Sequence, residues 1–247
     1  MARVRIYLTT ALAFWSPKKM QPLMLDSMLG YWKLREMGYK KNPSEQCPEN
    51  IIFPELPIEK EGMPGKEFYK ASAMFVPEEA KWSLTAVPRR CDSRESFVHQ
   101  AHCEFNTRDE QVSVFRAMFE TFLLLNTPYI DFYYTPIDSS DIDEMKRLLA
   151  MLKKSAYLGG KRSAGYGMIQ SIELHLKLHL KSEDWSVWKD GKPTRPIPVE
   201  YAGELDLPMD HCSFRPPYWY NKNKEMCYIP PLEQWYPSID LQNISVK

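Results

Sequence analysis

The 247-residue sequence is poor in glycine and cysteine, has no net charge and contains no long hydrophobic run. No apolar stretch reaches the roughly 20 residues that a transmembrane helix needs, and the first ten residues alternate in polarity, unlike a signal peptide. An odd number of cysteines, five in a chain of this length, fits reduced thiols better than a disulfide framework. We therefore expect a cytoplasmic protein that does not enter a membrane.

The balance of charge excludes binding to nucleic acid through the whole surface. Lysine plus arginine and aspartate plus glutamate each total 32 residues. A protein that binds nucleic acid through its overall charge is basic. Any such binding must therefore come from a local basic patch, or from a position inside a larger assembly.

Four of the ten glycines fall within residues 159–167, a segment that we call the glycine loop. Glycine tolerates positive φ angles and lets a ligand come close to the backbone, so such a cluster is typical of a binding loop. The segment also carries Lys161, Arg162 and Tyr166. Backbone N–H groups, cations and a stacking ring suit a phosphodiester strand, so the loop predicts binding of an RNA or DNA backbone. A flexible connection with incidental charge is the alternative.

Two nucleotide-binding motifs do not fit this loop. A P-loop requires Ser or Thr after its lysine, and here Arg162 follows Lys161. The dinucleotide fingerprint opens a helix after a strand. We expect the glycine loop to do the reverse and to lead from a helix into a strand.

The N-terminal part predicts a strand and then a helix. Hydrophobic and polar residues alternate from residue 3, which is the period of a half-buried strand, and we expect the strand to run to about Phe14. Apolar residues at helical spacing then follow Pro22, and Gly38 ends that run. The connection contains three candidate nucleic-acid contacts, although the first also fits a core residue: Trp15, Lys18 and Lys19.

The middle of the chain predicts long insertions. Residues 42–66 are rich in Pro, Glu and Gly without periodicity and indicate a loop, whereas residues 67–76 resemble a strand. Residues 77–111 are mainly polar and irregular. They contain a group of arginines that could form a nucleic-acid finger or simply a solvated loop: Arg89, Arg90 and Arg94.

Cysteine and histidine in this insertion do not have the spacing of a zinc site. Cys91, His99, His102 and Cys103 form neither a Cys-x-x-Cys pair nor a histidine pair with three to five residues between its members. We therefore predict no metal. A role for His99 or His102 as a general base in RNA cleavage stays open, because no neighbouring residue identifies a partner.

The second half predicts a strand at residues 129–134 and then a helix capped by Ser140 or Asp141, followed by the glycine loop and a strand across residues 172–180. Apolar residues at helical spacing should form the buried stripe of this helix: Ile142, Met145, Leu148, Leu149 and Leu152. The resulting order matches the split β-α-β plan of ferredoxin-like and RNA-recognition domains. We expect an α+β, ferredoxin-like domain over residues 1–181, with residues 77–111 as an insertion. The Pro- and Trp-rich residues 182–247 should form an irregular segment packed on the sheet or on a partner subunit.

A resemblance to a known family rests on the glycine loop and on the N-terminal helix. The sequence LGGKRSAGYGMI at residues 158–169 follows an acidic-capped helix and precedes an alternating strand. It resembles the glycine-rich loop of the RAMP superfamily of CRISPR effector proteins. The first strand and the helix containing PLMLDSMLGYW (residues 22–32) are similar to the Cas-five-type subunit of type IV systems. The resemblance covers about residues 3–180.

The resemblance implies a non-catalytic subunit of a ribonucleoprotein effector complex. Such a subunit caps the 5′ handle of the guide RNA beside the backbone filament and the large subunit, and it can take part in recognition of the protospacer-adjacent motif of target DNA. No cofactor is implied. The domain of this family carries an inserted hairpin or thumb. By position, residues 77–111 with Arg89, Arg90 and Arg94 would form it. The residues that would contact RNA in the loop are Gly159, Gly160, Lys161, Arg162, Ser163, Ala164, Gly165, Tyr166 and Gly167.

The alternative function is that of a metal-independent endoribonuclease that processes precursor CRISPR RNA. His99 or His102 would activate a 2′-hydroxyl, and Lys161 or Arg162 would stabilise the phosphorane. In the processing enzymes the glycine loop tends to lie near the C-terminus, whereas here 80 residues follow it. This position favours the capping subunit.

Overall fold

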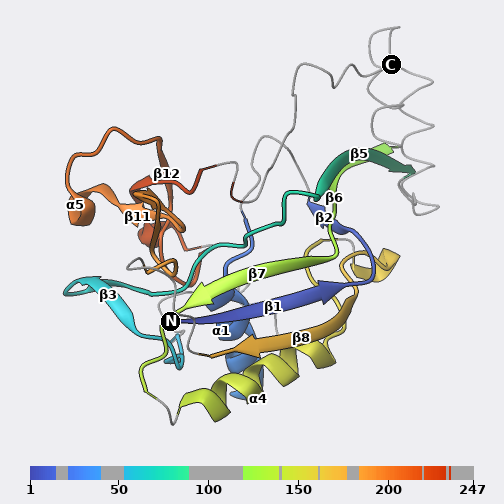
Figure 1. The fold of residues 1–247 in the computed structure, drawn as a ribbon, viewed down its shortest axis with the longest axis horizontal. Coiled ribbons are helices and arrows are strands. Elements are labelled where there is room, and N and C mark those ends of the chain that lie inside the picture. The colour runs from blue at the N-terminus through green and yellow to red at the C-terminus, as the bar shows by residue number, and fades with distance from the viewer. Residues whose placement is uncertain are drawn as a thin grey trace, which may run out of the picture.

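The structure is a computed structural model, and it describes residues 1–14, 22–39, 53–88, 119–138, 141–160, 162–176, 184–218, 220–231 and 234. These residues form a mixed α/β fold with several small antiparallel sheets. The expectation of an α+β protein agrees with this composition. Two helices and one central sheet make the body of the molecule, and a two-stranded arm leaves it at one end (Figure 1).

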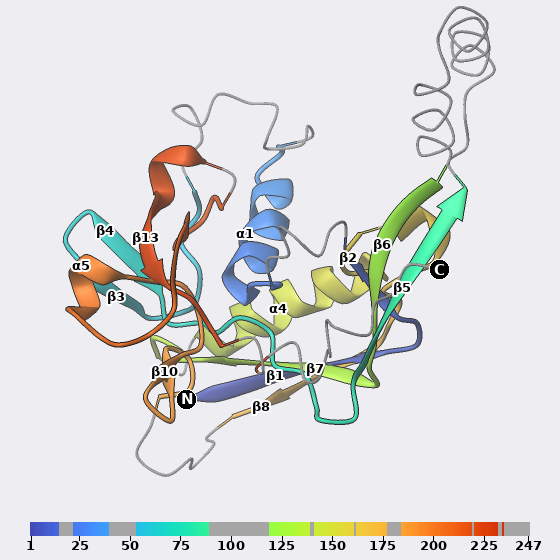
Figure 2. The same ribbon diagram turned by 90° about the horizontal axis from the view of Figure 1, so that it is seen from above.

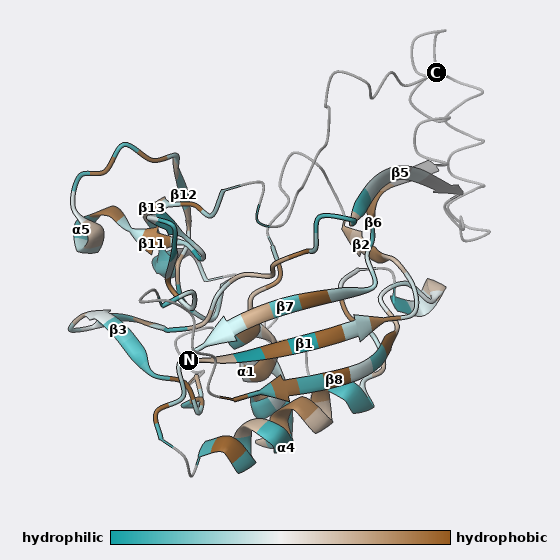
Figure 3. Ribbon diagram, viewed as in Figure 1, coloured by the Kyte–Doolittle hydropathy of each residue, from teal (hydrophilic) through white to brown (hydrophobic). Residues whose placement is uncertain are grey.

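The central sheet has the order β7-β1-β8, and its neighbouring strands are antiparallel: β7 (Tyr129–Tyr134), β1 (Ala2–Leu8) and β8 (Ile169–His175). Along β1 buried and half-buried residues alternate, because one face of the strand meets the core and the other does not. Figure 3 shows this alternation as bands of opposite hydropathy. The predicted period of the first strand is confirmed.

Residues 70–76 extend this sheet beyond β7. The Phe75 N–H donates to Asp131 O at 2.8 Å, and the Asp131 N–H donates back to Phe75 O at 2.9 Å. A further bridge joins Ala71 to Tyr134. The predicted strand at residues 67–76 is therefore divided, because its first part belongs to a separate hairpin of β3 (Lys60–Met63) and β4 (Lys66–Tyr69). The prediction of a loop across residues 42–66 is wrong for β3.

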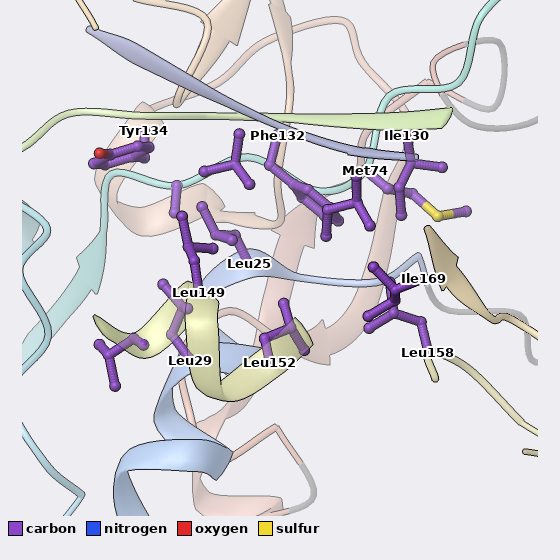
Figure 4. Close-up of a cluster of buried hydrophobic side chains, with 14 of the residues drawn as sticks. Leu25, Leu29, Met74, Ile130, Phe132, Tyr134, Leu149, Leu152, Leu158 and Ile169 are labelled. Carbon is purple, nitrogen blue, oxygen red and sulfur yellow. The ribbon is translucent and has the colours of Figure 1, made fainter. Parts of the chain in front are cut away.

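Two helices cover one face of the sheet (Figures 1 and 2): α1 (Leu25–Glu36) and α4 (Asp141–Lys154). The main hydrophobic core lies between them and the sheet, and Figure 4 shows part of it. Its centre includes Leu25 of α1, Phe132 of β7 and Leu148 of α4, each 0% exposed. The buried stripe predicted for α4 is confirmed for Met145, Leu148, Leu149 and Leu152, whereas Ile142 is only half-buried.

The first predicted strand is shorter than expected. β1 ends at Leu8, and β2 (Leu12–Phe14) belongs to a second sheet of order β2-β6-β5. The chain leaves the first sheet because residues 9–13 bind the glycine loop through main-chain and side-chain hydrogen bonds. Hydrophobic periodicity does not report such a contact with a distant segment.

Two strands of the second sheet form the arm that projects from the body (Figure 2): β5 (Lys81–Pro88) and β6 (Phe119–Asn126). They are paired along their whole length. The expected irregular structure across residues 77–111 is therefore wrong for β5. Residues 112–125 could have been strand or helix from their sequence, and β6 is a strand.

The C-terminal part contains several short strands between residues 188 and 228. The expectation of an irregular segment is wrong for these strands. A small hairpin and a three-stranded sheet of order β11-β13-β12 surround a second core that includes Phe214 and Cys227. Phe68 of β4 packs into this core. The elements are β9 (Trp188–Lys189), β10 (Lys192–Pro193), β11 (Ile197–Pro198), α5 (Val199–Ala202), β12 (Met209–Ser213), the 3₁₀ turn η5 (Asn221–Asn223) and β13 (Lys224–Tyr228).

A buried polar group that we call the Asp26 cluster joins this C-terminal part to α1. Its members are Asp26, Arg195 and Tyr218, and the first two side chains are 0% exposed. Tyr218 Oη donates to Asp26 Oδ2 at 2.8 Å, and Arg195 Nη2 lies 3.3 Å from the same oxygen. Arg195 also donates to Phe214 O at 2.6 Å and to Ala71 O at 2.9 Å. One guanidinium thus ties the helix, the sheet edge and the second core together.

Candidate nucleic-acid interface

The glycine loop is fixed to residues 9–13 by main-chain and threonine hydrogen bonds. Gly160 N–H donates to Ala13 O at 2.9 Å, and Gly167 N–H donates to Ala11 O at 2.8 Å. The hydroxyl of Thr10 donates to Gly165 O at 2.8 Å and accepts from the Met168 N–H at 2.9 Å. The two ends of the loop are therefore held by the connection between β1 and β2.

Two of its glycines allow this close approach. Gly167 has φ +73°, and a Cβ there would lie 2.0 Å from Leu158 O. Gly159 has φ +72°, and a Cβ would lie 3.1 Å from Ala13 O. A side chain at either position would adopt a disfavoured conformation and crowd the backbone of a neighbouring segment. These two glycines serve the fold of the loop.

The middle of the loop faces solvent. η4 (Arg162–Ala164) is a single 3₁₀ turn whose three residues are exposed, and the Gly165 N–H closes it by donating to Arg162 O at 3.0 Å. Gly165 has φ +85° with open space around its α-carbon. Within the described ranges Arg162 has no ion pair. The structure thus places a cation and small residues on an exposed turn that a hydrogen bond closes.

Tyr166 points away from this exposed turn. Its half-buried ring packs edge-to-face against Phe122 of β6, with ring centroids 5.5 Å apart. Tyr166 therefore links the glycine loop to the arm. The ring is therefore not part of the exposed turn.

The face of the central sheet opposite α1 and α4, which we call the outer face, presents aromatic and charged residues. Arg5 donates to both oxygens of Asp131, at 2.8 and 2.7 Å, and its guanidinium lies 3.8 Å from the centre of the Tyr129 ring. The hydrogen bonds to Asp131 raise the pKa of Arg5. Tyr7 donates to Glu173 Oε2 at 3.2 Å and packs edge-to-face on Tyr129. The centre of the outer face is thus rich in rings, with its arginine charge matched by carboxylates.

A cluster of aromatic rings marks the edge of this face near the start of β1. Tyr133, Phe75 and Trp185 form it, with the Tyr133 ring 5.0 Å from Phe75 and 5.1 Å from Trp185. Burial raises the pKa of the Tyr133 hydroxyl, so this residue is neutral at physiological pH. Beside the rings lies a cavity of about 230 Å³ that we call the lysine pocket. Its walls are formed by Phe75, Lys189, Asp190, Lys192, Pro231 and Gln234.

The sequence drew attention to part of this interface only. The basic and aromatic face of β1 was visible in its alternation, but the aromatic cluster and the lysine pocket were not predicted. Their signal is Lys-Asp-Gly-Lys at residues 189–192, since Asp-Gly between strands is a strong hairpin motif.

Seven predicted contacts lie outside the described residues: Trp15, Lys18, Lys19, Arg89, Arg90, Arg94 and Lys161. The histidines considered as a general base, His99 and His102, and the cysteines Cys91 and Cys103 lie outside them as well. The structure therefore brings together Gly159, Gly160, Gly165, Gly167 and the exposed residues of η4, with Tyr166 turned toward the arm.

The described part of the chain holds no group of metal ligands and no helix that could span a membrane. In the ranges that the structure describes, no three His, Cys, Asp or Glu side chains are placed to hold a metal ion. None of the helices in the same ranges has the length and apolar character needed to cross a bilayer. Cys212 and Cys227 are free thiols, and Cys227 is buried in the second core.

Comparisons with known proteins add no family. No protein-family model matches the sequence, and no curated protein is significantly similar to it. The function of this chain must therefore be inferred from its residues and their geometry.

Proposed function

We propose that the protein is a non-catalytic RNA-binding subunit of a type IV CRISPR ribonucleoprotein complex, in which it holds the 5′ handle of the guide RNA. The observation that carries the proposal is the glycine loop. Its ends are fixed by hydrogen bonds to residues 9–13, and its middle presents Arg162 without an ion-pair partner among the described residues. A turn of small residues that has fixed ends and carries an exposed arginine suits a phosphate backbone.

The arrangement of the central sheet supports a ferredoxin-like domain. Residues 70–76, β7, β1 and β8 lie side by side in that order, and α1 and α4 share one face. In chain order these elements follow the split β-α-β plan, with the β5–β6 arm inserted before β7. We propose that this arm is the thumb, and Tyr166 joins it to the glycine loop.

The outer face offers surfaces for unpaired bases. Tyr7 and Tyr129 lie on neighbouring strands and are half-buried, so part of each ring remains accessible. In RNA-recognition domains, aromatic residues on the corresponding face of a sheet stack two or three bases. We propose that a single strand leaves the glycine loop over these two tyrosines. Contact with target DNA and with the backbone and large subunits belongs to the same proposal.

One observation supports a second candidate function, that of a metal-independent endoribonuclease. His175 Nε2 lies 3.2 Å from Glu173 Oε2 on the outer face, and Glu173 also accepts the hydrogen bond from Tyr7. A histidine oriented by a carboxylate near arginines could act on an RNA phosphodiester. Arg3 pairs in register with His175, and Arg5 pairs with Glu173. Both arginines already form ion pairs with Asp131, which makes this candidate weaker.

The test is binding of a labelled CRISPR-repeat RNA to the full chain without added metal. We expect tight, salt-dependent binding by the wild type, intact RNA after incubation, and weaker binding by Lys161→Ala/Arg162→Ala. For a single strand the salt slope should fall by about 0.7 for each phosphate contact removed. Cleavage at one position, lost in His175→Ala, would instead favour the endoribonuclease. Equal binding by the wild type and the double variant would contradict a role for the loop.

A further inference from the structure

The lysine pocket is built on a tight hairpin that sets two cations opposite each other. Lys189 of β9 pairs directly with Lys192 of β10. Asp190 and Gly191, which join the strands, have φ +50° and +70°, the positive angles that a two-residue type I′ turn requires. Directly paired residues of an antiparallel hairpin point to the same side, so this backbone places both ammonium groups on one face.

Such a pair of like charges is unfavourable unless something anionic lies between them. Like charges that face each other across two strands destabilise a hairpin. In the described part of the chain neither lysine forms an ion pair, and Asp190 is the single carboxylate in the wall of the cavity. The pocket therefore carries an excess of positive charge.

Aromatic rings stand next to these cations. Lys189 Nζ lies 4.4 Å from the centre of the Trp185 ring and 5.5 Å from that of Phe75. Gln234 closes the cavity and is held in place, because its amide nitrogen donates to Thr194 O at 3.0 Å. At about 230 Å³ the cavity is smaller than the roughly 300 Å³ or more of sites that enclose whole drug-sized ligands. It has room for part of a ligand that combines an anion with a flat group.

The position of the pocket connects it to the proposed RNA path. Tyr133, whose ring touches Phe75 and Trp185, pairs with Arg3 near the start of β1, whereas the glycine loop is bound just after Leu8. At about 3.3 Å per residue the two sites are separated by roughly 20 Å along the strand. Tyr7 and Tyr129 lie on the same face between them.

We propose that the lysine pocket binds one nucleotide of the single-stranded RNA at the far end of the outer face from the glycine loop. Lys189 and Lys192 contact its phosphate, and the rings of Phe75 and Trp185 cover its base or sugar. This assignment rests on the proposed RNA-binding function. It adds a second cationic contact, and the two contacts together define the path of the strand across the sheet.

The experiment compares full-length proteins in equilibrium binding to the labelled repeat RNA. The test variant is Lys189→Gln/Lys192→Gln, and the control is Lys60→Gln/Lys146→Gln, which removes the same charge from two lysines paired with Glu55 and Asp143. We expect the test variant to lose about tenfold in affinity at low salt, with a salt slope smaller by about 0.7 for the lost phosphate contact. The control should bind like the wild type. Ultraviolet cross-linking should attach RNA to a peptide containing Trp185.

The outcomes separate this inference from the proposed function. If the glycine-loop variant Arg162→Ala weakens binding but the lysine variant matches the control, the pocket assignment is overturned and the RNA-binding function stands. If the wild type does not bind the RNA, the function itself fails. Binding of free AMP that requires both lysines, without any effect of these lysines on RNA affinity, would assign the pocket to a mononucleotide and overturn the RNA subsite.

Discussion

Charged residues have opposite surroundings in the Asp26 cluster and in the glycine loop. Asp26 and Arg195 are fully buried, and their polar atoms meet partners from three parts of the chain. Arg162 is exposed and has no ion pair within the described residues. A buried charge with several hydrogen-bond partners is retained for the arrangement that it holds, whereas an exposed and unpaired one is available to a ligand. The comparison predicts that changes in the first region affect stability and changes in the second affect binding.

The largest expected effect is the loss of stability on truncation of Asp26. Asp26→Ala leaves the Arg195 guanidinium buried without its carboxylate, and breaking a buried ion pair in this way costs about 3–5 kcal/mol. Chemical denaturation of the full chain measures the loss. Glu36→Ala is the control, because Glu36 forms an exposed pair with Arg147 on the solvent side of the same helix and should cost about 1 kcal/mol or less. Equal losses for the two variants would break the comparison.

The second effect divides the glycine loop into its fixed and its exposed parts. In Gly167→Ala the new methyl group would overlap Leu158 O, so we expect a loss of about 2–4 kcal/mol in the free energy of unfolding. In Gly165→Ala only the positive φ is unfavourable, because no atom lies within 4 Å of the added carbon, and we expect about 1 kcal/mol. Denaturation curves of the two variants provide the test. A larger loss at Gly165 would contradict the described geometry.

These glycines also show how much of the candidate site can be predicted from the sequence. Their clustering predicted a special loop, and the alternation in β1 and the stripe of α4 predicted the elements beside it. The roles of Gly167 and Gly165 could not be told apart, because the close contact depends on Leu158 and on the connection at residues 9–13. Local patterns give no information on such contacts between separate segments.

The same limit explains the errors in the C-terminal part. Arg195 looks like a surface residue in the sequence, and its burial depends on Asp26, which is 169 positions away. The strands β11 to β13 are only two to five residues long, which is too short for their sequences to show a clear alternation of hydrophobic and polar residues. The Asp190-Gly191 turn was the one local signal in this part of the chain.

The third effect concerns binding without a change in stability. Arg162→Ala should alter the free energy of unfolding by no more than about 0.5 kcal/mol, because the side chain is exposed. Its affinity for the repeat RNA should fall about tenfold, or about 1.4 kcal/mol, through loss of a charge-assisted phosphate contact. Thermal unfolding and RNA titration of the same preparation measure both. Unchanged affinity, or affinity lost only in proportion to unfolding, would count against the comparison.

The smallest effect is the pH response of a half-buried ion pair. Burial of Asp184 opposes its ionisation, but hydrogen bonds from Lys70 and Ser186 outweigh this and lower its pKa below the usual 3.8. A carboxyl group with a lowered pKa adds stability above its unfolded pKa, near 3.9, and loses that contribution as pH falls through the folded value. The difference in unfolding free energy between the wild type and Asp184→Asn should therefore be present at pH 7 and shrink below about pH 4. A difference that does not change with pH would show that the ion pair contributes nothing.

The central claim is that the exposed turn of the glycine loop holds RNA, and hydrogen–deuterium exchange tests it most directly without any substitution. The full chain is labelled with and without the repeat RNA, and exchange is followed in peptides across residues 155–170 and 25–36. We expect slower exchange on RNA binding in the loop, most at residues 162–165, and no change in α1, which lies on the face of the sheet opposite the outer face. RNA binding that leaves the loop unprotected, or that protects α1 instead, would contradict the claim.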